Sequence, residues 1–202
     1  MRRRTKVIAG IGAGLAVAGG ALAFVLLRPG PVLLDADDFP GVERAYQNER
    51  SAPPGWTSCD LSVSGWVRQG GPDTELIFGQ GQRAGAAIGV EPGPLSGGAA
   101  EEIAYLERTA AICADSEKTE RGFSIEPLTG LDDGAVGWRT KQEGYVRGDQ
   151  EVSVWGEYVV IPLDEHRLLA VGFETDQEEP PVDMDRLVEL AKQGAEQFPA
   201  AG

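Results

Sequence analysis

"AVGWRTKQEGYV" (residues 135–146) decides the fold, together with "EVSVWGEYVVI" (151–161) and "HRLLAVGFE" (166–174). In the first stretch Val136 and Trp138 alternate with smaller or polar neighbours, which is the period of a β-strand with one buried face. The connections between the stretches have about five residues, so they suit antiparallel hairpins and are too short for a crossover helix. The sequence therefore predicts a three-stranded antiparallel meander.

The region before the meander predicts further strands. "TELIFGQ" (74–80) and "GAAIGVE" (85–91) are short apolar runs separated by glycines. "CDLSVSGWV" (59–67) alternates apolar and polar residues. These patterns indicate two or three strands.

Two stretches have the periodicity of amphipathic helices. Residues 99–117 place four apolar side chains on one face: Ile103, Leu106, Ala110 and Cys113. The second stretch begins after Pro180 and Pro181 with Asp183 at the capping position, and its apolar stripe consists of Met184, Leu187, Ala191, Ala195 and Phe198. We therefore expect an α+β domain in which a twisted antiparallel sheet has two helices packed on one face.

The N-terminus has the pattern of a single-pass membrane anchor. Residues 7–27 contain 21 residues without a charge, and as a helix they would extend roughly 31 Å, close to the thickness of the hydrocarbon core. Most of the flanking positive charge precedes this stretch, so the N-terminus is expected in the cytoplasm and the bulk of the chain outside. The basic residues are Arg2, Arg3, Arg4 and Lys6 before the stretch and Arg28 after it.

A cleaved signal peptide is the alternative for the same segment. Cleavage following Ala23 would satisfy the small-x-small rule and release a secreted protein. The apolar run continues through residues 24–27, beyond that cut, and this favours a retained anchor.

A second feature of the segment permits a homodimer through the transmembrane helix. Gly10, Gly14 and Ala18 recur every four residues, a spacing that lets two helices approach closely. Small residues fill the whole segment, however, so some pair must fall at this spacing by composition alone.

The chain divides into five predicted parts. They are a cytoplasmic basic tail (1–6), the anchor (7–27), a proline-containing tether (28–55), an extracytoplasmic α+β domain (56–198) and a short tail (199–202). Within the tether, residues 42–49 are long enough only for a short helix.

The exterior part is strongly acidic. Residues 29–202 carry 13 basic and 32 acidic side chains, a formal charge of −19. Such a domain repels phosphate backbones, so nucleic acid is excluded as a partner, and cationic ligands are favoured. Solubility alone also accounts for the charge.

Cys59 and Cys113 are the only cysteines in the chain. Outside the membrane thiols oxidise, and one cysteine is expected on a strand and the other on the buried face of a helix, so a disulfide between them is predicted. Free or redox-active thiols are the alternative, but the C-x-x-C arrangement that lowers a thiol pKa is absent.

The order of these features resembles a known family. The features are, in order, an anchor, a tether, Trp56-x-x-Cys59 on a strand, a helix ending in "ICADSE" with Cys113, a meander and a terminal helix. This organisation resembles the extracytoplasmic sensor-like domains of actinobacterial membrane proteins and lipoproteins, including those attached to mycobacterial serine/threonine kinases. The resemblance covers residues 56–198 and implies a ligand-sensing or cell-envelope interaction module. That family commonly has a second disulfide, which this chain lacks.

No catalytic, cofactor or metal-binding motif stands in the sequence. His166 is the only histidine, which excludes a multi-histidine metal site, and the nucleophile-elbow motif is missing. Residues 79–84 match the loose dinucleotide fingerprint, but no helix is predicted after them. A carboxylate pair such as Glu157 with Asp164 leaves a secreted hydrolase as the least favoured alternative.

Three functional hypotheses follow. The first is a non-catalytic binding or sensing module for an envelope ligand or a membrane protein partner, with Trp66, Trp138 and Trp155 as candidate ligand-binding residues. The second is an accessory subunit that docks on another membrane protein, and the third is the hydrolase. An aromatic pocket favours the first hypothesis, a flat apolar patch the second, and paired acids in a cleft the third.

Overall fold

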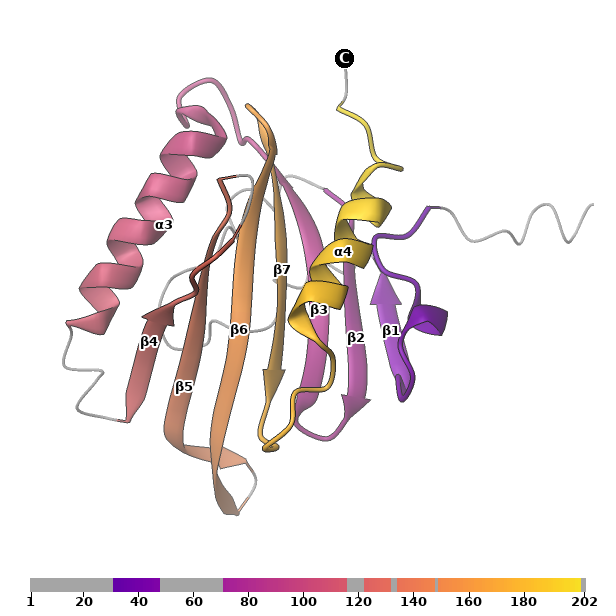
Figure 1. Cartoon of the computed structure of the whole chain (residues 1–202), viewed down its shortest axis with the longest axis vertical. Helices are drawn as coiled ribbons and strands as arrows, with labels where there is room; N and C mark the ends of the chain where they lie inside the picture. The colour runs from indigo at the N-terminus through magenta and orange to yellow at the C-terminus, as the bar shows by residue number, and fades with distance from the viewer. Residues whose placement is uncertain (1–30, 48–70, 116–121, 132–133, 148, 201–202) are drawn as a thin grey trace, which may run out of the picture. The chain divides into compact units, whose positions relative to one another are not determined.

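The structure, a computed structural model, describes residues 31–47, 71–115, 122–131, 134–147 and 149–200. Its core is a seven-stranded antiparallel sheet with the strand order β1-β2-β3-β7-β6-β5-β4, accompanied by two α-helices (Figure 1). In chain order the elements are η1 (Ala36–Asp38), β1 (Arg44–Gln47), β2 (Asp73–Gly79), β3 (Gln82–Val90), α3 (Gly98–Ala114), β4 (Phe123–Pro127), β5 (Val136–Arg147), β6 (Gln150–Asp164), β7 (Arg167–Thr175) and α4 (Met184–Ala195). The predicted α+β class with an antiparallel sheet and two helices is confirmed.

The predicted meander is present as β5, β6 and β7. Trp138 pairs with Tyr158, and Tyr158 pairs in turn with Gly172. β3 then joins β7 along its whole length, so the strands before α3 and those after it form one sheet. The sequence did not predict β4, because Phe123 and Ile125 alone carry its alternation and Pro127 ends it.

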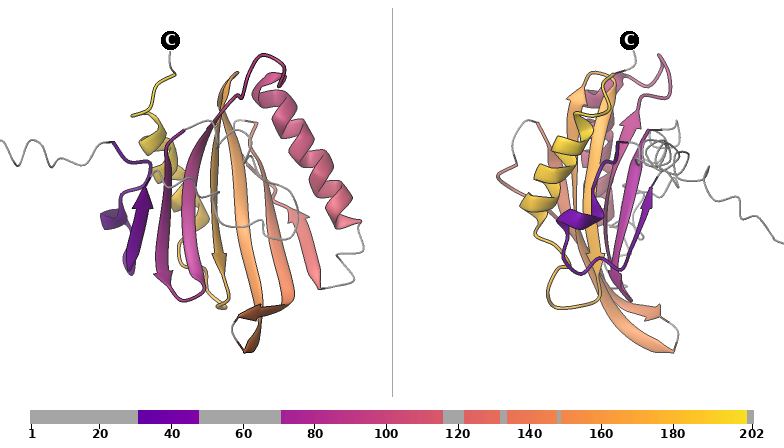
Figure 2. Two further views of the ribbon diagram at one scale, coloured as in Figure 1. Left: turned by 180° about the vertical axis from the view of Figure 1, so that it is seen from behind. Right: turned by 90° about the vertical axis from the view of Figure 1, so that its right-hand side faces the viewer.

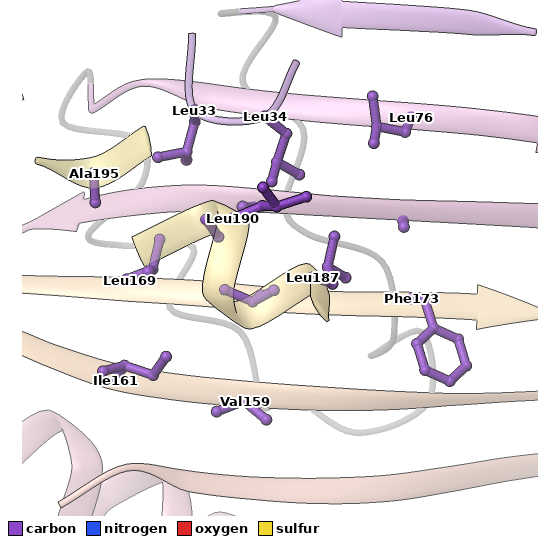
Figure 3. Packing of buried hydrophobic residues seen from close by; sticks show 14 of the residues in the cluster. Leu33, Leu34, Leu76, Val159, Ile161, Leu169, Phe173, Leu187, Leu190 and Ala195 are labelled. Carbon is purple, nitrogen blue, oxygen red and sulfur yellow. The ribbon is translucent and has the colours of Figure 1, made fainter. Parts of the chain in front are cut away.

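The two helices lie on opposite faces of the sheet, so the expectation that both pack on one face is wrong. α3 packs with Tyr158 and Leu168, whereas α4 packs with Val159 and Leu169. Because successive side chains of a strand point to opposite faces, these neighbours belong to two separate apolar clusters. Figure 3 shows the α4 cluster, with Leu187 over the sheet.

The physical reason is the composition of the central strands. β7 contains the continuous apolar run Leu168–Phe173, all of it buried, and such a run indicates a strand that is covered on both faces. The alternation of β5, which supported a sheet with one apolar face, does not extend to this strand. Figure 2 gives the sheet from behind and from its side, with α4 on one of its faces.

Residues 31–47 belong to the fold, so the predicted tether at 28–55 is wrong for this part. Leu33, Leu34 and Phe39 are almost fully buried in the cluster beneath α4. α4 approaches so closely that a Cβ added to Gly194 would lie 2.0 Å from the carbonyl oxygen of Leu33. The prolines around this stretch favour a spacer, but Leu33 and Leu34 pack against the sheet.

The short helix predicted near residues 42–49 is instead a strand. β1 pairs antiparallel with β2, with Ala45 opposite Leu76, and forms one edge of the sheet. A proline such as Pro40 just before the segment is compatible with the start of a helix and with a strand, so it does not distinguish the two.

Several predictions fall outside the described residues. They concern the anchor at 7–27, the strand at 59–67, Cys59 and Trp66. Among the described residues, no helix combines the length and the apolar character that crossing a membrane requires.

Candidate functional site

A cleft of about 380 Å³ opens between α3 and the β4–β5 edge of the sheet. α3 contributes its second half to one wall, and β4, β5 and the segment between them form the other. The lining residues are Glu107, Ala110, Ala111, Ala114, Ile125, Pro127, Leu128, Ala135, Val136, Gly137 and Trp138. Its size lies within the range of small-molecule sites, although near the lower end.

Small side chains on α3 leave this space open. Ala110, Ala111 and Ala114 face β4 and β5 from the second half of the helix. Longer side chains at these positions would fill the gap. Nearer the helix start, the larger Leu106 is fully buried in the apolar cluster and leaves no such gap. The cleft is therefore a consequence of the alanine-rich end of α3.

Trp138, a predicted ligand-binding residue, contributes to the wall of this cleft. Its ring stacks on Tyr158 with 6.1 Å between the ring centroids and 29° between the planes. Only 4% of its surface is exposed, so most of the ring serves the core. The part that lines the cleft is thereby held rigidly, because both strand neighbours and the stacked ring fix the side chain.

Among the described residues that line the cleft, Glu107 alone carries a charge, and it is exposed at the wall. Every other lining residue is apolar or glycine. The cleft therefore favours an uncharged apolar group, and the carboxylate disfavours an anionic one.

A second hollow of about 560 Å³ lies on the opposite face of the sheet and contains Trp155. The indole packs edge to face on Phe173, with 5.3 Å between centroids, and its Nε1 donates a 2.8 Å hydrogen bond to the carbonyl oxygen of Gln177. Nearby, Arg139 Nε donates to Glu157 Oε1 at 2.9 Å. The hollow is more polar than the cleft beneath α3, because its lining includes Arg139, Glu157 and Asp183.

Trp138 and Trp155 thus do not line one common groove. They belong to adjacent strands but to opposite faces, since Trp138 packs with the α3 cluster and Trp155 with the α4 cluster. Trp66, the third candidate, lies outside the described residues.

The predicted carboxylate pair is not assembled. Glu157 lines the second hollow and forms an ion pair with Arg139. Asp164 instead accepts hydrogen bonds from Arg167 Nε at 2.6 Å and from the backbone N–H of His166 at 2.9 Å. Partial burial raises the pKa of Asp164, but these hydrogen bonds outweigh it and hold the pKa below its usual value. An acid for glycoside hydrolysis needs the opposite shift.

A polar cluster that sequence reasoning missed surrounds Glu91 at the start of α3. His166 Nδ1 lies 2.5 Å from Glu91 Oε2, while Glu91 Oε1 accepts hydrogen bonds from the Ser96 hydroxyl and, at 3.1 Å, from the Gly98 N–H. The Ser96 bond, followed by the His166 bond, lowers the pKa of Glu91. The Glu91 bond raises the pKa of His166 above 6.5 despite some desolvation. No motif connects residues 75 positions apart, so spacing gave no signal.

The remaining sequence-based predictions concern the cysteines and metals. Cys113 lies on the buried face of α3 as expected, and no free cysteine is found in the described part of the chain. Since Cys59 is outside that part, its pairing with Cys113 stays a prediction. The described residues contain no group of three or more His, Cys, Asp or Glu side chains that could hold a metal ion.

Comparison with known proteins gives no match to a family model, a curated protein or a solved structure.

Proposed function

We propose that this protein is a membrane-tethered, extracytoplasmic binding or sensing module of the cell envelope that is not an enzyme. The observation that carries the proposal is the apolar cleft between α3 and the β4–β5 edge, with Trp138 in its wall. The resemblance of the chain's organisation to actinobacterial sensor-like domains supports the same assignment. So does the dispersal of the candidate catalytic carboxylates, Glu157 and Asp164, into separate ion pairs.

The chemistry of the walls specifies the kind of ligand. A neutral, apolar group gains free energy from leaving water in such a cleft, at about 25 cal/mol for each Å² of apolar surface that it buries. Phosphate or carboxylate groups find no cation among the described lining residues and would face Glu107. The ligand is therefore the apolar part of an envelope molecule, with any anionic group held outside the cleft.

Site-specific photocrosslinking in the native membrane tests this proposal. The photoreactive residue p-benzoylphenylalanine replaces Ala111, which lines the cleft, or Ile112, which is 70% exposed and is not among the lining residues. Irradiation of cells followed by mass spectrometry of the purified protein should reveal a small apolar adduct at position 111. The same adduct should be absent at position 112, which is the matched control.

Adducts that are equally abundant at the two positions, or absent from both, would contradict the cleft as the binding site. The two probes occupy adjacent positions in the chain, so both experience the same cellular surroundings. The difference between them therefore reports the cleft alone.

An accessory subunit that docks on another membrane protein is the second candidate. Tyr105 and Ile112 are large apolar side chains that α3 exposes to solvent, 45% and 70% respectively. Exposed apolar side chains on one helix favour contact with a protein surface. In the experiment above, a protein crosslinked at position 112 without a small adduct at 111 would favour this function.

A further inference from the structure

The start of α3 lacks a side-chain cap of its own. Gly97 occupies the N-cap position and makes no capping hydrogen bond, although capping residues normally satisfy the first free amides of a helix. Two groups outside the helix replace the cap. Glu91 Oε1, just after β3, accepts from the Gly98 N–H at 3.1 Å, and the carbonyl oxygen of Glu165 in the β6–β7 turn accepts from the Ala99 N–H at 2.8 Å.

Glu91 is itself held by the β6–β7 turn. Its backbone N–H donates to the His166 carbonyl at 2.9 Å, and its carboxylate contacts the His166 ring at 2.5 Å. The Glu91 side chain is only 12% exposed, whereas the His166 side chain is 65% exposed and open to protons from solvent. The helix start, the end of β3 and the turn therefore share one network in which His166 is the group that titrates near neutrality.

The helix start and the turn are also in close contact. Gly98 has a φ of 78°, and a Cβ on it would lie 2.9 Å from the Glu165 carbonyl oxygen. The site thus requires glycine both for the backbone conformation and for the approach of the turn. Any movement of α3 away from the sheet at this end must break the bonds to Glu91 and Glu165 together.

We propose that His166 and Glu91 form a proton-operated clamp that fixes the start of α3 to the sheet and so controls how readily α3 moves at the cleft. With His166 protonated and Glu91 ionised, the clamp is closed. Loss of the His166 proton removes the ion pair and loosens the helix start. Because the second half of α3 is one wall of the cleft, the clamp regulates ligand exchange there, a consequence that rests on the proposed function.

The direction of the pH response follows from the groups that face His166. Glu91 from the end of β3 raises its pKa most, against some desolvation, and Glu165 and Asp164 in its own turn add to the rise. Asp164 is already paired with Arg167. A raised histidine pKa means that the clamp is complete below about pH 6.5 and is lost as the pH rises through the raised value. The lowered pKa of Glu91 keeps the clamp closed until the pH falls below about 4.5.

Hydrogen exchange of the full chain, purified in detergent, tests the clamp without any ligand. Exchange is measured at about pH 5.5 and about pH 8 and corrected for the intrinsic rate of free amides. Residues 97–102 should exchange about threefold faster at the higher pH after correction, the size expected for a partly exposed ion pair. Residues 107–114, which include the cleft wall, should change in the same direction by a smaller factor.

Two variants and one control test whether the His166–Glu91 contact causes the pH dependence of exchange. His166→Gln and Glu91→Gln should both abolish the pH dependence in these two segments. Glu189→Gln on α4 removes the same charge as Glu91→Gln but contacts Arg186 on the other face of the sheet, and it should retain the response. Three results would overturn the proposal. They are equal corrected exchange at the two pH values in the parent, a pH response that persists in His166→Gln, and a pH response limited to residues 97–102. Since no ligand is present, failure here is distinct from failure of the crosslinking experiment.

Discussion

Trp138 serves two structural roles through one side chain. Its ring completes the apolar cluster between α3 and the sheet by stacking on Tyr158, and the remaining edge of the residue lines the cleft. Across β4 it faces Pro127, which has no N–H and closes the edge of the sheet beside it. A change at this residue therefore affects the stability of the fold and the shape of the site together.

Replacement of Trp138 by alanine is expected to lower the free energy of unfolding by about 3–5 kcal/mol, because it removes a large buried ring and leaves a cavity. Urea unfolding followed by circular dichroism measures the loss. Tyr145→Ala is a suitable control, because Tyr145 is 42% exposed, and it should change the unfolding free energy by less than about 1 kcal/mol. Similar losses for the two variants would show that Trp138 is not a core residue.

The elements differ in how they are attached to the sheet. α4 begins with its own cap, since Asp183 Oδ1 accepts the Arg186 N–H at 2.9 Å, and Leu187 and Ala191 lie fully buried on its inner face. α3 has no such cap and depends on bonds to β3 and the β6–β7 turn. α4 is therefore defined by its local sequence, whereas the start of α3 is defined by tertiary contacts.

Replacement of Asp183 by alanine should destabilise the protein by about 1 kcal/mol, because the Arg186 amide at the helix start loses its acceptor. Asp185→Ala removes the same charge from the first turn but no capping bond, so thermal unfolding should show a smaller shift for this variant. The cap would be unimportant if both variants shifted the midpoint equally.

Local periodicity was sufficient to predict some elements and not others. The alternation in β5 and the stripe that includes Leu187 predicted a strand and a helix, because each depends on residues close in sequence. The faces of the sheet were not predictable in this way. Leu168 and Leu169 are equally apolar, and only the tertiary arrangement shows that one contacts the α3 cluster and the other the α4 cluster.

Only one residue of the candidate site could be predicted from the sequence. Trp138 was recognised by its type, but the opposite wall comes from Ala111 and Ala114 on α3, and small residues carry no signal for a cleft. The Glu91–His166 contact joins the end of one strand to a distant turn, so it required the sheet order β3-β7-β6 to be known. Glu157 and Asp164 were paired by chemical type alone, and each proved to have an arginine partner.

At the scale of the whole molecule, segments distant in sequence pack on both faces of the sheet. Leu33 and Leu34 from the N-terminal side of the domain join α4 over one face, and α3 packs on the other face against β4, β6 and β7. The pairing of β3 with β7 connects residues about 90 positions apart, such as Ala84 with Phe173. Closing such long loops costs chain entropy, so a covalent link that shortens them would stabilise the fold appreciably.

The predicted disulfide between Cys59 and Cys113 would close a loop of its own and so lower the entropy of the unfolded chain. The two residues are 54 positions apart, and the chain-entropy relation gives about 4 kcal/mol of stabilisation for a loop of this length. Cys113 is 8% exposed and lies among the apolar residues between α3 and the sheet. A serine in its place would therefore bury a hydroxyl group in apolar surroundings, which adds to the loss of stability. Protein purified without reductant should therefore show no reactive thiol when unfolded, and two thiols after reduction. In denaturant unfolding, the double variant Cys59→Ser/Cys113→Ser should have a free energy of unfolding lower by at least about 4 kcal/mol. Two thiols in the unreduced, unfolded protein would reject both the bond and the oxidising compartment that it implies.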